Sequence, residues 1–214
     1  MDTVICGGRL PDTSEYEVGF DGTGKITALK MLIYADAGQG DGAAGFSAII
    51  AGKNMEQIYW LPNADVQVKM CTTAKPGNTA VRGPGEPQAT YHMESIIAHI
   101  AEELDISQQQ VREVNIFGSL ADREKCAANP TSPDIEQYSP LFASGKTIEG
   151  KPMTDFPALG IWMSLKDKVN FDAKLAEVEK LNAEHRWRKR GMRMTPVKAR
   201  SGIPEATVPC ESVR

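Results

Sequence analysis

The sequence predicts an α+β fold, because three β-rich runs precede the most strongly periodic helical segment in the chain. The first two runs lie between residues 15 and 38 and flank an Asp-Gly turn. The third run, residues 64–73, alternates apolar and polar side chains as a half-buried strand does. The helical segment follows from about residue 87. A chain of 214 residues is long enough to enclose such a core.

The two runs before residue 40 predict a β-hairpin. The segments "EYEVGF" and "KITALKMLIYADAG" flank "DGTG", in which Asp-Gly and a second glycine supply positive φ angles at low cost. In the third run, "ADVQVKMCTT", Val66, Val68 and Met70 alternate with polar neighbours. The glycine-rich segment between the second and third runs ends in a predicted short helix, Ser47 to Met55.

The most clearly predicted helix begins after the segment "VRGPGEP". Its apolar residues recur at i, i+3, i+4, i+7 and i+11 and form one stripe. Ser107 and Gln110 then form a capping box that begins a second helix. Residues 119–155 are polar and rich in turn signals, so they are predicted to be loop. The stripe consists of Met93, Ile96, Ile97, Ile100 and Leu104.

A last helix is predicted from Asn170 to Arg190, with Gly191 as its C′ residue. Basic residues at its end suit the negative end of the helix dipole. The chain opens on a strand-like fragment and closes on a loop, so we expect a segment of a longer protein.

Composition and charge argue against nucleic-acid-binding, membrane-spanning and secreted classes of protein. With 41% hydrophobic residues, 24% charged residues and a net charge of −4, the chain is typical of a soluble globular protein without a general attraction to nucleic acid. No run of about 18 apolar residues predicts a membrane span, and the start lacks the features of a secretory signal. The four cysteines have no metal-binding or disulfide spacing, which favours reduced thiols and a cytoplasmic protein.

The loop before the first long helix is the main candidate site. Pro87 fits a helical first turn, while Gly83 and Gly85 allow the backbone to approach a ligand. The N–H groups of a helix start favour an anion, and Arg82 adds a charged donor. The alternative is a tight strand-to-helix turn with a solvent-facing arginine. A Gly-x-Gly pattern alone does not decide between the two.

The remaining candidates have ordinary explanations. His99 and Glu103 are spaced i, i+4, but two ligands without a third make a poor metal site. The histidines are therefore predicted to be structural or surface residues. The basic run at residues 185–200 contains one aromatic residue, and a solvated helix end explains it better than nucleic-acid binding does.

Several landmarks in collinear order resemble the aldehyde oxidase / xanthine dehydrogenase family of molybdenum hydroxylases. They are "GGRLPDTSEYEVGFDGTGKITAL", "IYWLPN", "CTTAKPGNTAVRGPGEPQ" and "AEVEKLNAEHRWRKRGMRMTPVK". The segments resembling Glu-x-x-x-x-x-(Ile/Val)-Ala and Val-Arg-x-x-Asn lie between the last two. The resemblance implies a mixed, curved β-sheet with helices packed on one side, as part of a molybdopterin-binding domain. It divides the chain into residues 1–118, a loop-rich connection at 119–168, and 169–214 as the start of the next subdomain.

The resemblance implies a part of a large subunit that hydroxylates aldehydes or N-heterocycles with oxygen from water. Val81, Arg82 and Gly83 would contact molybdenum-molybdopterin, largely through backbone groups. Purine-oxidising members carry Arg-Gly-Phe where this chain has Pro84 after Arg-Gly, and Ile50 stands where they carry an arginine. Both differences suit an apolar aldehyde in the plant-type aldehyde oxidase branch.

Other family features are absent from this chain. The Gly-Phe-Gly-Gly motif, the Gly-x-Glu-x-Gly-Gln-Gly motif and the general-base glutamate do not occur here, so no catalytic residue is assigned and the chain alone is not expected to turn over. Iron–sulfur clusters and FAD would bind in other parts of the parent protein, which is expected to be a homodimer. The rival interpretations are a non-catalytic truncated paralogue and a small anion-binding module without cofactor.

Overall fold

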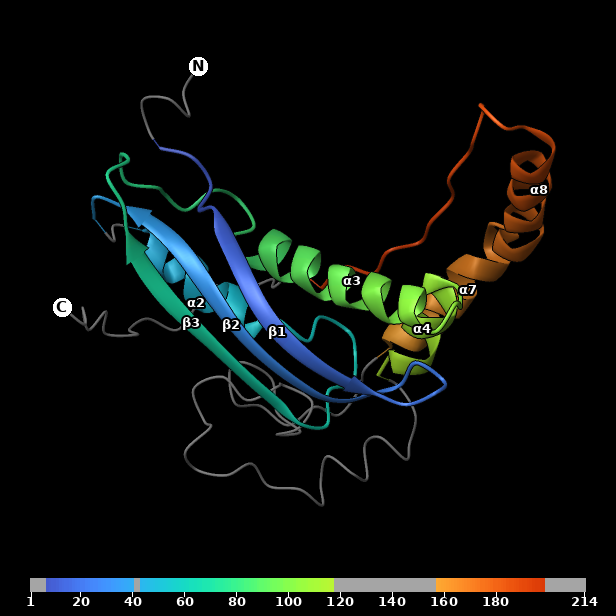
Figure 1. The fold of residues 1–214 in the computed structure, drawn as a ribbon, viewed down its shortest axis with the longest axis horizontal. Coiled ribbons are helices and arrows are strands. Elements are labelled where there is room, and N and C mark those ends of the chain that lie inside the picture. Colours follow the sequence, from blue (N-terminus) through green and yellow to red (C-terminus); the bar gives the residue numbers. More distant parts are fainter. Residues whose placement is uncertain (1–6, 41–42, 118–156, 199–214) are drawn as a thin grey trace.

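The described part of the structure is built on one three-stranded mixed sheet (Figure 1). The computed structural model describes residues 7–40, 43–117 and 157–198. The strand order is β1-β2-β3, with β1 antiparallel to β2 and β3 parallel to β2. The sheet therefore has the mixed character that the family resemblance implied. The strands are β1 (Asp12–Phe20), β2 (Ile26–Gly38) and β3 (Ala64–Thr72).

The hairpin between β1 and β2 confirms the prediction from the Asp-Gly turn. The Asp21 carboxylate accepts the backbone N–H of Thr23 at 2.8 Å, and Gly24 adopts a φ of +84° that favours glycine. The Asn115 side chain donates to the Gly24 carbonyl and accepts the N–H of Ile26, both at 2.8 Å. A buried side chain from a distant helix thus fixes the turn.

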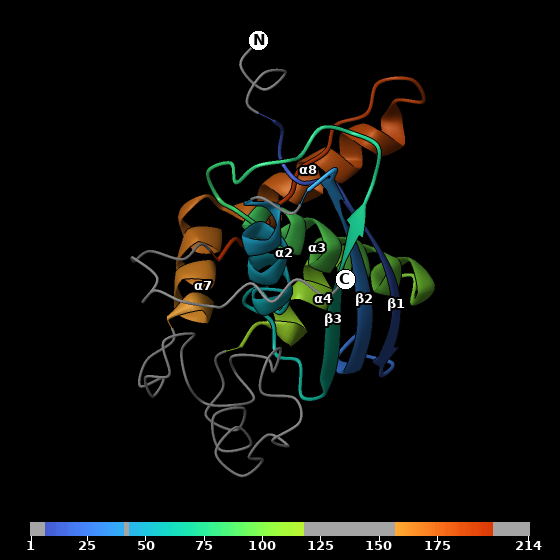
Figure 2. The same ribbon diagram turned by 90° about the vertical axis from the view of Figure 1, so that its left-hand side faces the viewer.

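Helices cover one face of the sheet, as the resemblance implied. Figure 2 shows α2 and α3 on the same side of the three strands. Ile33 in β2 and Met93, Ile96 and Ile97 in α3 are completely buried between them. The helical periodicity predicts this buried stripe, and its removal from water stabilises the packing of α3 against the sheet. The helices are α2 (Ala44–Lys53), α3 (Glu86–Glu103), α4 (Gln108–Asn115), α7 (Ala158–Lys168) and α8 (Phe171–Glu184).

The structure confirms the capping box at Ser107 and corrects the last helix. The predicted helix to Arg190 is wrong, because α8 ends at Glu184 and Gly191 is not its C′ residue. The Asn182 side chain accepts the Arg190 N–H at 2.8 Å and donates to the Arg190 carbonyl at 2.9 Å. These two bonds fold the chain back along α8, so the basic residues lie in a bend beyond the helix.

Helix α7 lies in the segment that the sequence had assigned to a loop-rich connection. It packs against α8, and Trp162 and Phe171 are the buried residues of this pair. The predicted loop at 119–155 lies outside the described residues. None of the helices in the described ranges is long and apolar enough to cross a membrane.

The chain after α8 returns across α3, as Figure 1 shows in red. Arg193 reaches the carboxylate of Glu94 in α3 at 2.8 Å, and Lys198 pairs with the buried Glu56 at 2.5 Å. Burial raises the pKa of Glu56, against the opposing effect of the Lys198 charge. These ion pairs attach the end of the described chain to the sheet and helix core.

Candidate functional site

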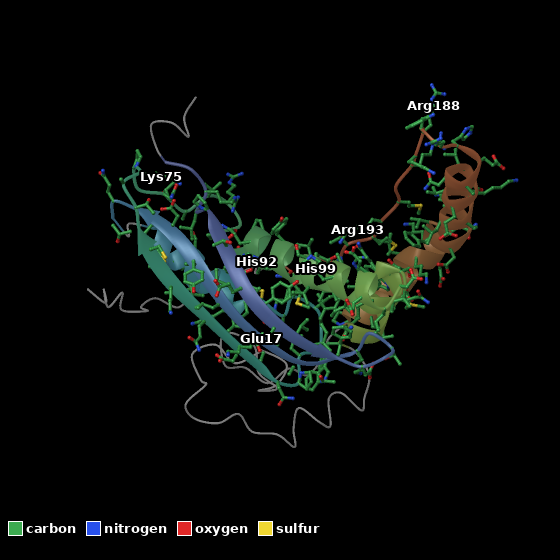
Figure 3. The ribbon with its side chains drawn as sticks, in the orientation of Figure 1. Glu17, Lys75, His92, His99, Arg188 and Arg193 are labelled. Atoms are coloured by element: carbon green, nitrogen blue, oxygen red, sulfur yellow. The ribbon has the colours of Figure 1, made fainter. Side chains whose placement is uncertain are left out.

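The connection between β3 and α3 is organised by the side chain of Asp36 in β2. One carboxylate oxygen accepts the Thr73 hydroxyl at 2.6 Å and the Gly38 N–H at 2.9 Å, and the other pairs with Lys75 at 3.1 Å. These hydrogen bonds lower the pKa of Asp36 to about 2, and the largest effect comes from the Thr73 hydroxyl, followed by the Gly38 N–H and Lys75. Asn78 donates to the Asp36 carbonyl at 2.9 Å. The first half of the connection is therefore held at the end of the sheet, where Figure 3 shows Lys75.

Arg9 holds the second half of the connection from the N-terminal side. Its two terminal nitrogens donate to the carbonyls of Gly83 and Arg82, each at 2.7 Å. The Thr79 N–H donates to the Gly8 carbonyl at 3.0 Å, and Arg9 and Thr79 form a parallel bridge. Arg9 belongs to the segment GGRLP, where the resemblance to the family begins, but no local pattern predicts its role.

Two glycines shape the loop, but for different reasons. Gly83 has a φ of +68°, and the nearest atom to a Cβ placed on it is Pro87 Cδ at 3.5 Å. Gly85 has a φ of +92°, and a Cβ there would lie 2.4 Å from the Ser47 carbonyl oxygen and 2.5 Å from the Ala51 nitrogen. The absence of a side chain at Gly85 therefore allows the start of α3 to pack directly against the backbone of α2. This corrects the expectation that Gly85 brings the backbone close to a ligand.

The start of α3 is already occupied by an acidic side chain. Glu86 is the first helical residue and is 8% exposed, and its Oε2 has no hydrogen-bond partner within the described residues. That oxygen lies 3.9 Å from a Cβ placed on Gly83. A carboxylate in the first turn stabilises the helix dipole and repels a second anion. This observation disfavours a simple anion site made from the helix start alone.

The structure brings the residues predicted for the site into one region. Val81 and Pro84 are half-buried, whereas Arg82 and Gly83 are exposed. Ile50 lies in α2 and is 5% exposed. A Cβ on Gly85 would lie 3.0 Å from the Ile50 carbonyl carbon, so the end of the loop directly contacts the α2 backbone at this residue. Their proposed contacts with cofactor and substrate stay predictions.

A buried ion-pair network explains the landmarks in α3 and α4. Arg112 is 1% exposed, and its Nε and Nη2 donate to Glu94 Oε2 at 2.9 and 2.6 Å. The Tyr59 hydroxyl donates to the other Glu94 oxygen at 2.5 Å, and Arg193 joins the network from the returning chain. Burial, followed by the Glu94 charge, raises the pKa of Tyr59. The network connects four chain segments and is structural.

Two histidines lie between α3 and β1, as Figure 3 shows. His92 Nδ1 is 3.0 Å from the Ser14 hydroxyl, and its Nε2 is 3.3 Å from an Asp12 carboxylate oxygen. His99 is hydrogen-bonded to the Tyr16 hydroxyl and stacks on that ring. Both histidines therefore contribute contacts between strand and helix. Across residues 7–40, 43–117 and 157–198, no three His, Cys, Asp or Glu side chains gather in a way that could hold a metal ion.

Comparison with known proteins shows the family of this chain. The model of the molybdopterin cofactor-binding domain matches residues 1–116. Aldehyde oxidase 1 of Cavia porcellus is 30% identical over 94% of this chain, and nicotinate hydroxylase of Emericella nidulans is 30% identical over 96%. The chain spans 13% of the length of each of these two relatives.

Solved structures show the same fold at low sequence identity. The aldehyde oxidoreductase from Desulfovibrio gigas matches 80% of this chain and 16% of its own, with a TM-score of 0.59 and 18% identity. The quinoline 2-oxidoreductase from Pseudomonas putida 86 matches 81% of this chain and 20% of its own, with a TM-score of 0.55 and 18% identity. The described arrangement of sheet and helices is thus a known one.

Proposed function

Because this chain belongs to the molybdopterin cofactor-binding domain family of the molybdenum hydroxylases, we propose that it forms one wall of the molybdopterin site in a hydroxylase large subunit. The single observation that carries the proposal is the exposure of Arg82 and Gly83 in a loop whose two carbonyls are fixed by Arg9. An exposed loop supported on several sides can receive a ligand without a large ordering cost.

The residues of the loop fit a pterin cofactor that carries a phosphate. Gly83 is exposed, so a ligand can meet the loop there, although Pro87 Cδ lies at the ordinary contact distance of 3.5 Å from a Cβ placed on this glycine. The exposed Arg82 guanidinium supplies donors suited to a phosphate, and Val81 supplies further backbone groups. When bound, the molybdenum–pterin centre supplies hydroxylation of a carbon atom with oxygen from water. This chain binds and orients the cofactor, whereas the general base, the iron–sulfur clusters and any flavin belong to other parts of the protein.

We assign the substrate side of the site to Pro84 and Ile50. Neither side chain offers a hydrogen bond to a purine oxygen, so an apolar aldehyde is the preferred substrate class. Pro84 is half-buried and Ile50 is 5% exposed, so Pro84 presents more of its surface. One of the two relatives at 30% identity is an aldehyde oxidase and the other a nicotinate hydroxylase, so N-heterocycles are the second class to be assayed.

A chimera tests the proposal. The 214-residue chain would replace the matching segment of Cavia porcellus aldehyde oxidase 1, and pterin and molybdenum would be measured in the purified protein. Equal molar amounts of both are expected, together with turnover of an aromatic aldehyde in preference to a purine. A soluble, folded chimera without pterin would overturn the proposed cofactor contact. Preference for the purine would overturn only the substrate assignment.

A control separates the cofactor loop from general disturbance. Arg82 and Arg188 are both exposed arginines, and Arg188 lies far from the loop, in the bend after α8 (Figure 3). Arg82→Ala in the chimera should lower the retained pterin, whereas Arg188→Ala should leave it unchanged. Equal retention in both variants would remove Arg82 from the proposed site.

A further inference from the structure

We infer that Arg9 is a positioning residue, which turns the Arg82–Gly83 peptide so that the Gly83 N–H faces the ligand side of the loop. The inference rests on the proposed function, since it names the backbone donor that the cofactor would meet. Its basis is the pair of 2.7 Å bonds from one guanidinium to two consecutive carbonyls. Bonds this short from a charged donor are among the stronger hydrogen bonds in proteins.

The direction of the Gly83 N–H follows from peptide geometry. In a planar trans peptide the N–H points opposite to the C=O of the same unit, and the described residues contain no cis peptide bonds. The Arg82 carbonyl points at Arg9, so the Gly83 N–H points away from it. Within the described residues no backbone acceptor takes this N–H. The next residue, Pro84, has no N–H to offer, which makes Gly83 the donor at this point of the loop.

Arg9 can act in this way because its own backbone is fixed on both sides. A Cβ on Gly7 would lie 2.8 Å from the Gly77 carbonyl oxygen, so the two segments run in direct contact. On the other side, the Gln88 side chain donates to the Leu10 carbonyl at 3.1 Å. The backbone of Arg9 is therefore fixed in position, and its planar guanidinium can donate to two carbonyls at once. A lysine at this position could not reproduce that fork.

Nuclear magnetic resonance of the 214-residue chain tests the clamp without any cofactor. In the wild type the ¹⁵N order parameter of the Gly83 amide should be near that of rigid backbone, about 0.85. In Arg9→Ala and in Arg9→Lys it should fall below about 0.6, while amides of β2 stay rigid. Arg188→Ala serves as the control and should leave Gly83 rigid. A rigid Gly83 amide in Arg9→Ala would overturn the inference. A rigid Gly83 amide in Arg9→Lys would overturn it too, because a positive charge alone would then be enough to hold the loop.

Pterin retention in the chimera then separates this inference from the proposed function. Loss of two charge-assisted bonds is expected to speed release of pterin about tenfold in both Arg9 variants. Unchanged release from variants with a mobile Gly83 would overturn the link between the clamp and the cofactor. A wild-type chimera without pterin would overturn the proposed function, and the order parameters would still decide whether Arg9 holds the loop.

Discussion

Replacing Gly85 with alanine is the sharpest test of how the loop is anchored, because Gly83 provides a matched control. Both glycines have positive φ angles, at which an alanine costs about 1–2 kcal/mol. At Gly83 the new Cβ meets nothing closer than 3.5 Å. At Gly85 it would lie 2.4 Å from the Ser47 oxygen, about 1 Å closer than ordinary contact. Overpacking of this kind adds about 1–3 kcal/mol.

The expected loss of unfolding free energy is therefore about 1–2 kcal/mol for Gly83→Ala and about 2–5 kcal/mol for Gly85→Ala. Urea denaturation of the 214-residue chain measures both, with equal m-values as the condition for comparison. The difference between the variants isolates the contact of α3 with α2, since the backbone term is common to both. Equal losses would refute the close approach at Gly85 and with it the placement of the loop end against α2.

Three further outcomes are expected. Arg112→Met leaves the buried Glu94 without its main partner and should lower the free energy of unfolding by about 3–5 kcal/mol, measured by urea denaturation. Adding Glu94→Gln should recover part of this loss, and no recovery would contradict the ion pair. Asp36 has a folded pKa of about 2 against 3.8 unfolded, so its stabilisation is present above 3.8 and lost as pH falls to about 2. The melting-temperature advantage of wild type over Asp36→Asn should disappear at that pH, and a constant advantage would contradict the assignment. Asn182→Ala should speed hydrogen exchange at the Arg190 amide while β2 is unaffected, and unchanged exchange would contradict the bend that Asn182 holds.

Local sequence patterns determined the elements that depend on neighbouring residues. The Asp-Gly turn and the apolar stripe of α3 were predicted from local patterns, and the structure contains both. The alternation predicted for β3 holds only as far as Val68, because Met70 is 39% exposed and Cys71 is half-buried. The capping box at Ser107 is equally local, because its two partners are three residues apart. The order of the family landmarks likewise predicted the family, which the match to the molybdopterin cofactor-binding domain over residues 1–116 confirms.

Local patterns gave the wrong end for the last helix and no role for Arg9. Residues 185–190 suit a helix by composition, yet the Asn182 side chain folds them back, and no periodicity carries that information. Gly85 illustrates the same limit, because a glycine in a loop does not say which neighbour comes close.

The sequence by itself therefore determined the family and the type of most elements, and it singled out the loop at residues 81–85 as the candidate site. The tertiary structure alone decided what holds that loop. Its supports come from Arg9, from Asp36 in β2 and from α2, which are separated from the loop by tens of residues. Hydrogen bonds and steric contacts act over a few ångströms in space, and only folding brings residues so distant in sequence within that range.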